Sequence, residues 1–137
     1  MIWFVGAGCY HPDMLTIGAK KLLEQADCVL YDHLVNLEFL EYTKEECECI
    51  CVGKRGHHAS FLQKDILTLL VEKDQEYSQV VRLKGGDPFL FARGSEEMRY
   101  VLEHGCDCQY VPGISSAIGA LGYAGIPVTQ RHTATGF

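Results

Sequence analysis

The residues best suited to chemistry stand in short polar runs that each follow an apolar segment. The longest run is Leu83–Glu97, with the sequence LKGGDPFLFARGSEE. Gly85 and Gly86 lack side chains, so a ligand can lie directly against their backbone, and Asp87 offers a carboxylate to a hydroxyl or an ammonium group. Arg93 stands just before a predicted helix, where it can reach out of the loop. A Gly-Asp-Pro turn leading into a capped helix explains much of the same run without a ligand.

An acid and a lysine follow two other apolar segments. Asp32 comes after the second such segment of the chain and Lys54 after the third. At the ends of neighbouring strands these side chains are candidates for proton transfer, although an exposed salt bridge would use the same residue types and is at least as common. Arg93 and Glu96 are three residues apart, a spacing that also suits an ion pair on one helix face.

The opening glycines suggest a different chemistry. Gly6-Ala7-Gly8 follows the first apolar segment, as in the fingerprint of dinucleotide-binding domains. That fingerprint needs a third glycine three residues further on, where helix and strand pack closely. Here His11 occupies the position. An NAD(P)-dependent oxidoreductase with a Rossmann domain is therefore an alternative from another class, and the missing glycine counts against it.

Only a sheet can bring these separated runs together. Short apolar runs predict strands over 2–5, 28–31, 48–52, 79–83 and 108–111. Helical spacing predicts helices over 16–26, from Ser60 to 71, from Ser95 to 105 and over 114–124. Such alternation predicts an α/β fold, a mainly parallel sheet of about five strands with helices on both faces. Ligands of such sheets bind at the carboxyl ends of the strands, where all of the runs lie.

Composition limits the range of functions. With 137 residues the chain has the size of one domain, and its net charge of −6 argues against nucleic acid or an acidic membrane as a partner. No apolar run is long enough to cross a bilayer and the first residues do not form a signal peptide, which together predict a cytoplasmic protein. The seven cysteines lack zinc-site spacing, so no metal is expected.

Taken together, the runs resemble the tetrapyrrole (corrin/porphyrin) methylase family, and within it most closely the uroporphyrinogen-III C-methyltransferases. The resembling stretches occur in the family's order and span nearly the whole chain: Val5–Gly8, Asp27–Val35, Val52–His58, Val81–Glu97, Val111–Ala117 and Tyr123–Arg131. The first loop departs from the family. Cys9 stands where the family has a proline that touches the cofactor, and His11 replaces an aspartate.

The resemblance implies a two-domain, homodimeric enzyme with S-adenosylmethionine bound in the cleft between the domains. Residues 1–137 match the amino-terminal domain, and the second domain is expected to be absent from this chain, which would then be inactive alone. Asp32 corresponds to the proton acceptor and Lys54 to the proton donor, while Arg93, Glu96 and Arg131 match positions that grip the substrate. Cofactor contacts fall at Cys9, Gly85, Gly86, Asp87, Leu90, Ser115 and Ser116.

The expected substrate, uroporphyrinogen III, carries eight carboxylates, and guanidinium groups bind carboxylates even in a protein of negative net charge. We therefore expect Asp32, Lys54, Arg93 and Arg131 to surround one open groove. Two alternatives remain beside the oxidoreductase: a precorrin methyltransferase of later cobalamin synthesis, and a binding domain without catalytic activity.

Overall fold

Five parallel strands form the centre of the computed structural model, which describes residues 1–53 and 62–136. The strand order is β3-β2-β4-β1-β5, and every neighbouring pair is parallel. The strands are β1 (Ile2–Gly6), β2 (Cys28–Tyr31), β3 (Glu48–Cys51), β4 (Val80–Lys84) and β5 (Cys108–Val111). All carboxyl ends consequently lie along one edge of the sheet. The predicted α/β fold with a five-stranded parallel sheet is confirmed.

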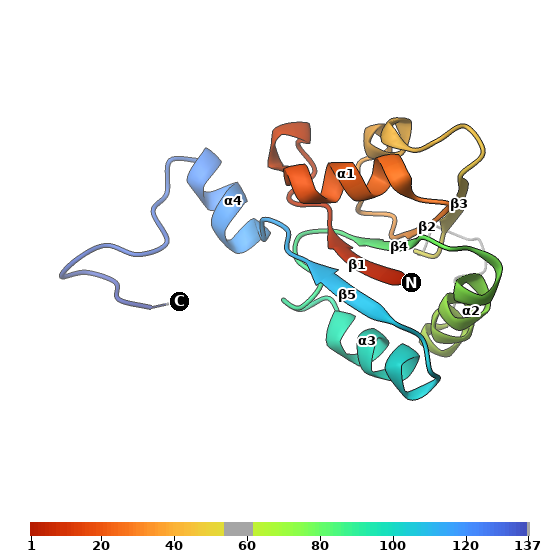
Figure 1. Ribbon diagram of the computed structural model, residues 1–137. Helices are drawn as coiled ribbons and strands as arrows, with labels where there is room; N and C mark the ends of the chain where they lie inside the picture. The colour runs from red at the N-terminus through yellow and green to blue at the C-terminus, as the bar shows by residue number, and fades with distance from the viewer. Residues whose placement is uncertain (54–61, 137) are drawn as a thin grey trace.

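Helices cover both faces of the sheet, as Figure 1 shows. On one face, α1 (Ile17–Gln25) and the 3-10 segment η2 (Leu37–Tyr42) bury Leu23 and Phe39. On the other, α2 (Gln63–Glu76) and α3 (Gly94–Glu103) bury Leu70 and Val101. A short 3-10 turn, η1 (Pro12–Met14), precedes α1. The central strand β4 is buried along its whole length, because layers of helix lie on either side of it.

Local side chains determine where the helices begin. The Thr16 hydroxyl accepts a hydrogen bond from the Ala19 amide at 3.1 Å and caps α1. Of the two serine starts predicted above, the one at Ser95 is wrong. The Asp65 carboxylate accepts the Leu62 amide at 3.0 Å, so α2 begins after Leu62, and Ser60 lies outside the described residues.

The start of α3 differs from the prediction for a steric reason. Arg93 is its N-cap, with a left-handed φ of 59°, and Ser95 lies inside the helix. The Gly94 amide donates to the Pro88 carbonyl at 2.9 Å. Only a glycine fits there, because a Cβ on Gly94 would overlap that carbonyl. The turn within the polar run therefore starts α3 two residues earlier than a cap at Ser95 would.

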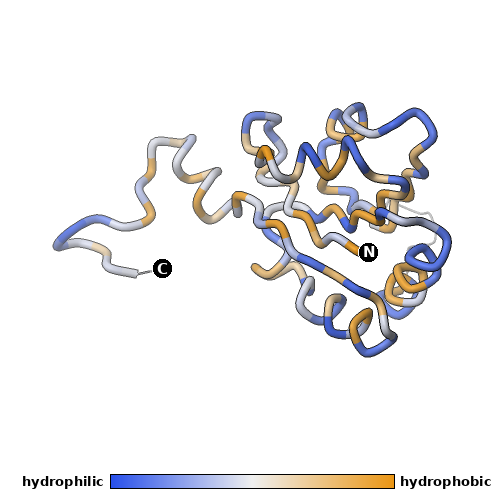
Figure 2. The backbone as a smooth tube through the Cα atoms, viewed as in Figure 1, coloured by the Kyte–Doolittle hydropathy of each residue, from blue (hydrophilic) through white to orange (hydrophobic). Residues whose placement is uncertain are grey.

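The last helix, α4 (Ser116–Tyr123), differs from the others in having no buried residue. It follows β5 and leads into residues 124–136, which extend away from the sheet (Figure 1). Figure 2 shows hydrophobic residues along α4, and Ile118, Tyr123 and Ile126 are exposed. Among the described residues, no helix combines the length and apolarity that a membrane span requires.

Backbone packs on backbone where β1, β4 and β5 end. Gly8 and Gly86 exchange two hydrogen bonds, of 3.1 and 2.8 Å, between the loops after β1 and β4. Gly113, after β5, lies so close to Gly6 and Gly86 that a Cβ on it would overlap the Gly86 carbonyl oxygen. Three loops are thus held together without intervening side chains.

Gly113→Ala is expected to lower the free energy of unfolding by about 1–3 kcal/mol, since the added methyl group must push two loops apart. Gly122→Ala in α4 is the control, because a Cβ there meets no atom within 4 Å outside the helix and alanine favours a helix. Urea denaturation followed by circular dichroism measures both. Equal stability of the two variants would contradict the close packing described here.

Candidate functional site

A hollow of about 450 Å³ opens at the carboxyl edge of the sheet, between the loops that follow β1, β4 and β5. All seven residues predicted to contact a cofactor line it: Cys9, Gly85, Gly86, Asp87, Leu90, Ser115 and Ser116. Leu34, Phe91 and Ala120 add apolar surface. Segments far apart in the sequence are thus brought to one cavity, and their role in cofactor binding stays a prediction.

Asp87 shapes this hollow from within the protein. One carboxylate oxygen accepts hydrogen bonds from the Tyr110 hydroxyl at 2.6 Å and from the Gly113 amide at 3.1 Å. The other accepts from the Phe89 amide at 2.8 Å. Burial and this carboxylate raise the pKa of Tyr110 to about 12, so its hydroxyl remains a donor at neutral pH. Asp87 therefore ties the loop after β4, which contains Gly85 and Gly86 and is called the glycine loop below, to β5. Both of its oxygens already accept hydrogen bonds before any ligand hydroxyl or ammonium arrives.

Cys9 performs a similar task on the other side of the hollow. Its thiol donates to the Ile114 carbonyl at 2.9 Å and links the loop after β1 to the loop after β5. His11 accepts the Asp13 amide at 3.3 Å and caps η1. The two residues that depart from the family's first loop thus have local partners here. The loop after β1 therefore leads into the short 3-10 turn η1, whose N-cap His11 stands where a dinucleotide fingerprint would have its third glycine.

A second hollow, of about 310 Å³, adjoins the first and contains Asp32. The two hollows share Leu34, Gly85, Leu90 and Phe91 in their walls. A ligand that fills the first hollow therefore borders the space in front of Asp32. This adjacency places a carboxylate beside a cofactor-sized cavity at one edge of the sheet.

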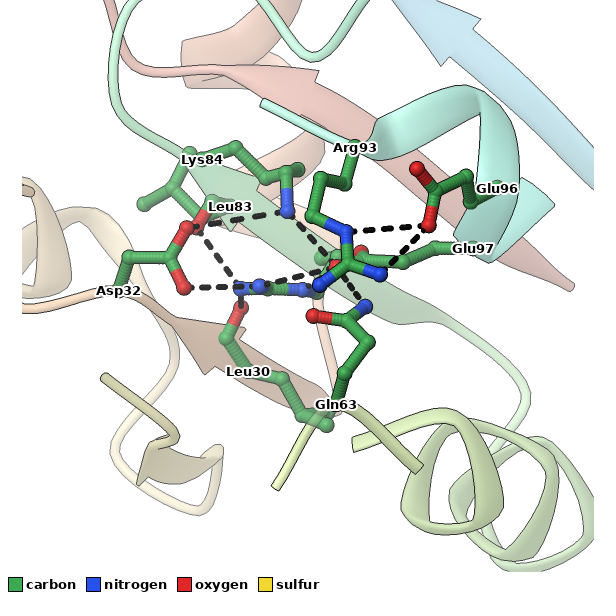
Figure 3. Close-up of polar contacts among 9 residues, drawn as sticks. Leu30, Asp32, Gln63, Leu83, Lys84, Arg93, Glu96 and Glu97 are labelled. Atoms are coloured by element: carbon green, nitrogen blue, oxygen red, sulfur yellow. Dashed lines mark hydrogen bonds and ion pairs between the residues drawn. The ribbon is translucent and has the colours of Figure 1, made fainter. Parts of the chain in front are cut away.

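Buried charges hold the Asp32 carboxylate (Figure 3). Arg82 donates from Nη2 to Asp32 Oδ1 at 2.7 Å and from Nε to Glu97 Oε2 at 3.0 Å. Lys84 donates to Glu97 Oε1 at 2.9 Å and lies 3.8 Å from Asp32 Oδ2. Gln63 donates a further hydrogen bond to Glu97 at 3.0 Å. The side chains of Arg82 and Glu97 are 1% exposed and that of Lys84 4%, whereas Asp32 is 26% exposed.

Burial of this cluster disfavours its ionised groups, and charges of opposite sign within it favour them. Burial alone would raise the pKa of Glu97, but the positive charges of Arg82 and Lys84 lower it below its ordinary value. The pKa of Lys84 is lowered, first by burial and then by the charge of Arg82. Burial opposes the charge of Arg82, yet the two carboxylates raise its pKa, so the guanidinium stays charged.

Sequence reasoning missed the burial of Arg82, Lys84 and Glu97. A signal was available in the strand predicted over 79–83, where Arg82 interrupts the apolar sequence and Lys84 follows directly. A charge in a strand covered on both faces must have a buried partner of opposite sign. Which carboxylate supplies it depends on the packing of α3, and the sequence does not show that.

Arg93 and Glu96 form the ion pair that their spacing allowed. Arg93 Nη2 lies 2.7 Å from Glu96 Oε2, and both side chains are more than half exposed. The backbone around the hollows is unusual, with left-handed φ values at Tyr10 (77°), Phe91 (54°) and Arg93 (59°). Such conformations cost energy and concentrate at functional sites. Their position here agrees with a binding surface next to α3.

The expected groove of four polar side chains is only partly formed. Asp32 and Arg93 lie in loops at the same edge of the sheet, and Lys54 lies outside the described residues. Arg131 is not brought to this edge, which corrects that expectation. It is exposed, and it lies in the segment 124–136, which extends away from the sheet. Close to it in this segment, backbone hydrogen bonds join Gln130 to Thr133 and Ala134. A substrate contact by Arg131 or by Lys54 stays a prediction.

The comparisons with known proteins agree on one family. The family model of the Tetrapyrrole (Corrin/Porphyrin) Methylases matches residues 1–137. A uroporphyrinogen-III C-methyltransferase of Methanocaldococcus jannaschii is 49% identical over 133 residues, which are 97% of this chain and 55% of that protein. A siroheme synthase of Chromobacterium violaceum is also 49% identical over 133 residues, 97% of this chain and 28% of that protein.

A solved structure gives the same result. The crystal structure of uroporphyrin-III C-methyltransferase from Thermus thermophilus complexed with S-adenosyl homocysteine has a TM-score of 0.84 and 40% identity. The match covers 99% of this chain and 56% of that one. The chain therefore spans about half the length of the C-methyltransferases that it matches.

Tyr110→Phe is expected to lower the free energy of unfolding by about 1–2 kcal/mol, because Asp87 loses a charge-assisted hydrogen bond. Tyr123→Phe is the matched control, since Tyr123 is 68% exposed and such surface changes stay within about 0.5 kcal/mol. Urea denaturation compares the two. A Tyr110 variant as stable as its control would mean that Asp87 does not hold the loop through this bond.

Proposed function

The chain belongs to the tetrapyrrole methylase family, and from this premise we propose that its protein transfers methyl groups from S-adenosylmethionine to carbon atoms of uroporphyrinogen III, giving precorrin-2. The observation that carries the proposal is the adjacency of the two hollows, one lined by the glycine loop and the other containing Asp32. The named relatives at 49% identity support this substrate over a later precorrin. The family assignment argues against the oxidoreductase.

The first hollow suits the proposed cofactor. Gly85 and Gly86 present bare backbone, while Leu34 and Leu90 offer apolar surface to an adenosine or a thioether. The relative from Thermus thermophilus was crystallised with S-adenosyl homocysteine. Cys9, Ser115 and Ser116 complete the proposed contacts, and Asp87, which also lines the hollow, holds the loop in place. The bound sulfonium would supply an electrophilic methyl group.

Asp32 is the proposed proton acceptor. Methylation of a pyrrole carbon leaves a proton that a base must remove, and Asp32 borders the cofactor hollow with its carboxylate held by Arg82. Lys54 is proposed as the proton donor on the ground of the family resemblance.

Arg93, Glu96 and Arg131 are proposed to bind the substrate's carboxylates. Arg93 follows Ala92, which lines the Asp32 hollow, and its exposed guanidinium can exchange Glu96 for a carboxylate of the macrocycle. A local guanidinium is needed because the net charge of the chain is −6 and its general field repels an anionic substrate.

We also propose that residues 1–137 form the amino-terminal domain of a two-domain enzyme that acts as a homodimer in the cytoplasm. The chain spans 55% of its relative from Methanocaldococcus jannaschii, a length that would accommodate a second domain closing the cofactor hollow. The exposed apolar side chains of α4, among them Ile118 and Leu121, support burial of this helix in an assembly.

The direct test is a reaction of the full-length protein with uroporphyrinogen III and S-adenosylmethionine under anaerobic conditions. Mass spectrometry is expected to find a product two methyl groups heavier than the substrate. Unchanged uroporphyrinogen III, together with methylation of a later precorrin, would replace this proposal with the other member of the family. Binding of either ligand without any methyl transfer would favour a non-catalytic binding domain.

Gly85→Ala is expected to weaken binding of S-adenosyl homocysteine by about tenfold or more, equivalent to about 1.4 kcal/mol. Its Cβ would meet only Leu34, at an ordinary 3.4 Å, so the fold tolerates the methyl group while the hollow loses space. Calorimetric titration of the full-length protein measures the affinity. Gly122→Ala is the control, and equal affinities would remove Gly85 from the cofactor site.

Asp32→Asn is expected to slow turnover of uroporphyrinogen III by about a hundred-fold to ten-thousand-fold, because an amide cannot accept the proton. Binding of S-adenosyl homocysteine should be retained, which controls for correct folding. Steady-state rates and calorimetry provide the two readouts. Wild-type turnover by this variant would exclude Asp32 as the base.

A further inference from the structure

Four charged side chains, Asp32, Arg82, Lys84 and Glu97, form one contiguous ionic quartet in which positive and negative charges are equal in number. Asp32 lines the second hollow. Arg82, Lys84 and Glu97 are buried beneath it, between β4 and α3. A macrocycle in the hollow could therefore touch Asp32 but none of the other three. The three buried charges can thus act on a bound macrocycle only through Asp32.

The contacts of Glu97 show how the cations are shared. Its Oε2 receives Arg82 Nε at 3.0 Å, and its Oε1 receives Lys84 Nζ at 2.9 Å. Arg82 Nη2 donates to Asp32 at 2.7 Å and more weakly to Glu97 Oε1 at 3.5 Å, and Lys84 approaches the second oxygen of Asp32 at 3.8 Å. Figure 3 shows Lys84 between the two carboxylates. Each cation is thus divided between a buried and an accessible carboxylate.

This division affects Asp32 as a base. A cation beside a carboxylate favours its ionised form and lowers its pKa, whereas a nearby anion does the opposite. Arg82 and Lys84 both lie against the Asp32 carboxylate and would act on it undivided if Glu97 were absent. Glu97 offsets part of their charge from the far side. These effects are large here because burial reduces the screening of charges by water.

We propose that Lys84 and Glu97 are positioning residues for Asp32, which hold its carboxylate against Arg82 and set by their opposite charges the pH range in which it accepts a proton. The inference rests on the proposed function in taking Asp32 as the base. It goes further in assigning a role to two buried residues that do not reach the substrate.

The charged surroundings of Asp32 come from three elements. Within residues 1–53 and 62–136, Arg82 and Lys84 of β4 face its oxygens. Glu97 of α3 faces both cations, and Gln63 of α2 donates to Glu97 as a neutral partner. His33 follows Asp32 in the chain and lines the same hollow. Substitutions at Lys84 and Glu97 change the charge while leaving Arg82, His33 and Gln63 in place.

The test is the pH dependence of kcat/KM for uroporphyrinogen III in the full-length protein. If Asp32 is the base, activity requires its ionised form, so a change of charge beside it should move the acid limb of the profile. Lys84→Met removes a cation and is expected to move that limb to higher pH by about one unit. Glu97→Gln removes an anion and is expected to move it to lower pH by about one unit. Titration of the substrate's own carboxylates contributes equally to every variant.

Two further variants make the test specific. The double variant Lys84→Met/Glu97→Gln loses one charge of each sign, so its acid limb should return toward that of the wild type. Glu103→Gln is the matched control, an exposed carboxylate on the same helix that pairs with Arg99 at 4.0 Å, and should cause no shift. Shifts of Lys84→Met and Glu97→Gln in the same direction, or no shift in Lys84→Met, would overturn the proposal. Should Glu97→Gln fail to fold, Lys84→Met and the double variant decide.

A second readout separates this inference from the proposed function. In protein with 13C-labelled aspartate carboxyls, the Asp32 signal is assigned by its loss in Asp32→Asn and then titrated by NMR. Without any turnover of uroporphyrinogen III the proposed function fails, and opposite shifts of this titration in Lys84→Met and Glu97→Gln would still support the quartet. An Asp32 titration unchanged by either substitution refutes the positioning role, whatever the protein catalyses.

Discussion

Two buried positive charges on the central strand, Arg82 and Lys84, constrain the rest of this structure. Arg82 and Lys84 lie on β4, which is covered on both faces, and removing the partner of a buried charge costs about 3–5 kcal/mol. Their partners come from outside the strand: Glu97 from α3, and Asp32 from the loop after β2. The need to neutralise β4 therefore sets where α3 packs and where the Asp32 carboxylate points. The same ion pairs neutralise the buried charges of β4 and hold the Asp32 carboxylate at the edge of the sheet.

The same edge is built in a second way, from contacts between loops. Gly8 and Gly86 are joined by backbone hydrogen bonds, Asp87 connects the glycine loop to Tyr110 and Gly113, and Cys9 bonds to Ile114. The carboxylate of Asp87 thus accepts its hydrogen bonds from the protein itself. What remains for a ligand is backbone and apolar surface, which suits the adenosyl part of the proposed cofactor better than the many carboxylates of the proposed substrate.

The loop contacts and the buried charges lie on either side of the wall that the two hollows share. This wall is formed by Leu34, Gly85, Leu90 and Phe91. On one side lies a cavity for the proposed methyl donor, and on the other lies the proposed base. Methyl transfer followed by proton removal needs both groups within reach of one carbon atom. A fold that joins them through adjacent strand ends provides this without long side chains, and the family assignment gives this geometry its chemical interpretation.

The order of strands and helices, the parallel sheet and the site-bearing loops follow from hydrophobic periodicity and glycine placement, which are local properties of the chain. Grouping Cys9, Gly85 and Ser115 around one cavity was likewise predictable, since parallel strands end at one edge. The start of α3, the internal partners of Asp87 and the separation of Arg131 from the edge were decided only in three dimensions. So was the burial of Glu97 against Arg82 and Lys84. Which charge pairs with which depends on distances between segments far apart in the sequence, and no local pattern encodes those distances.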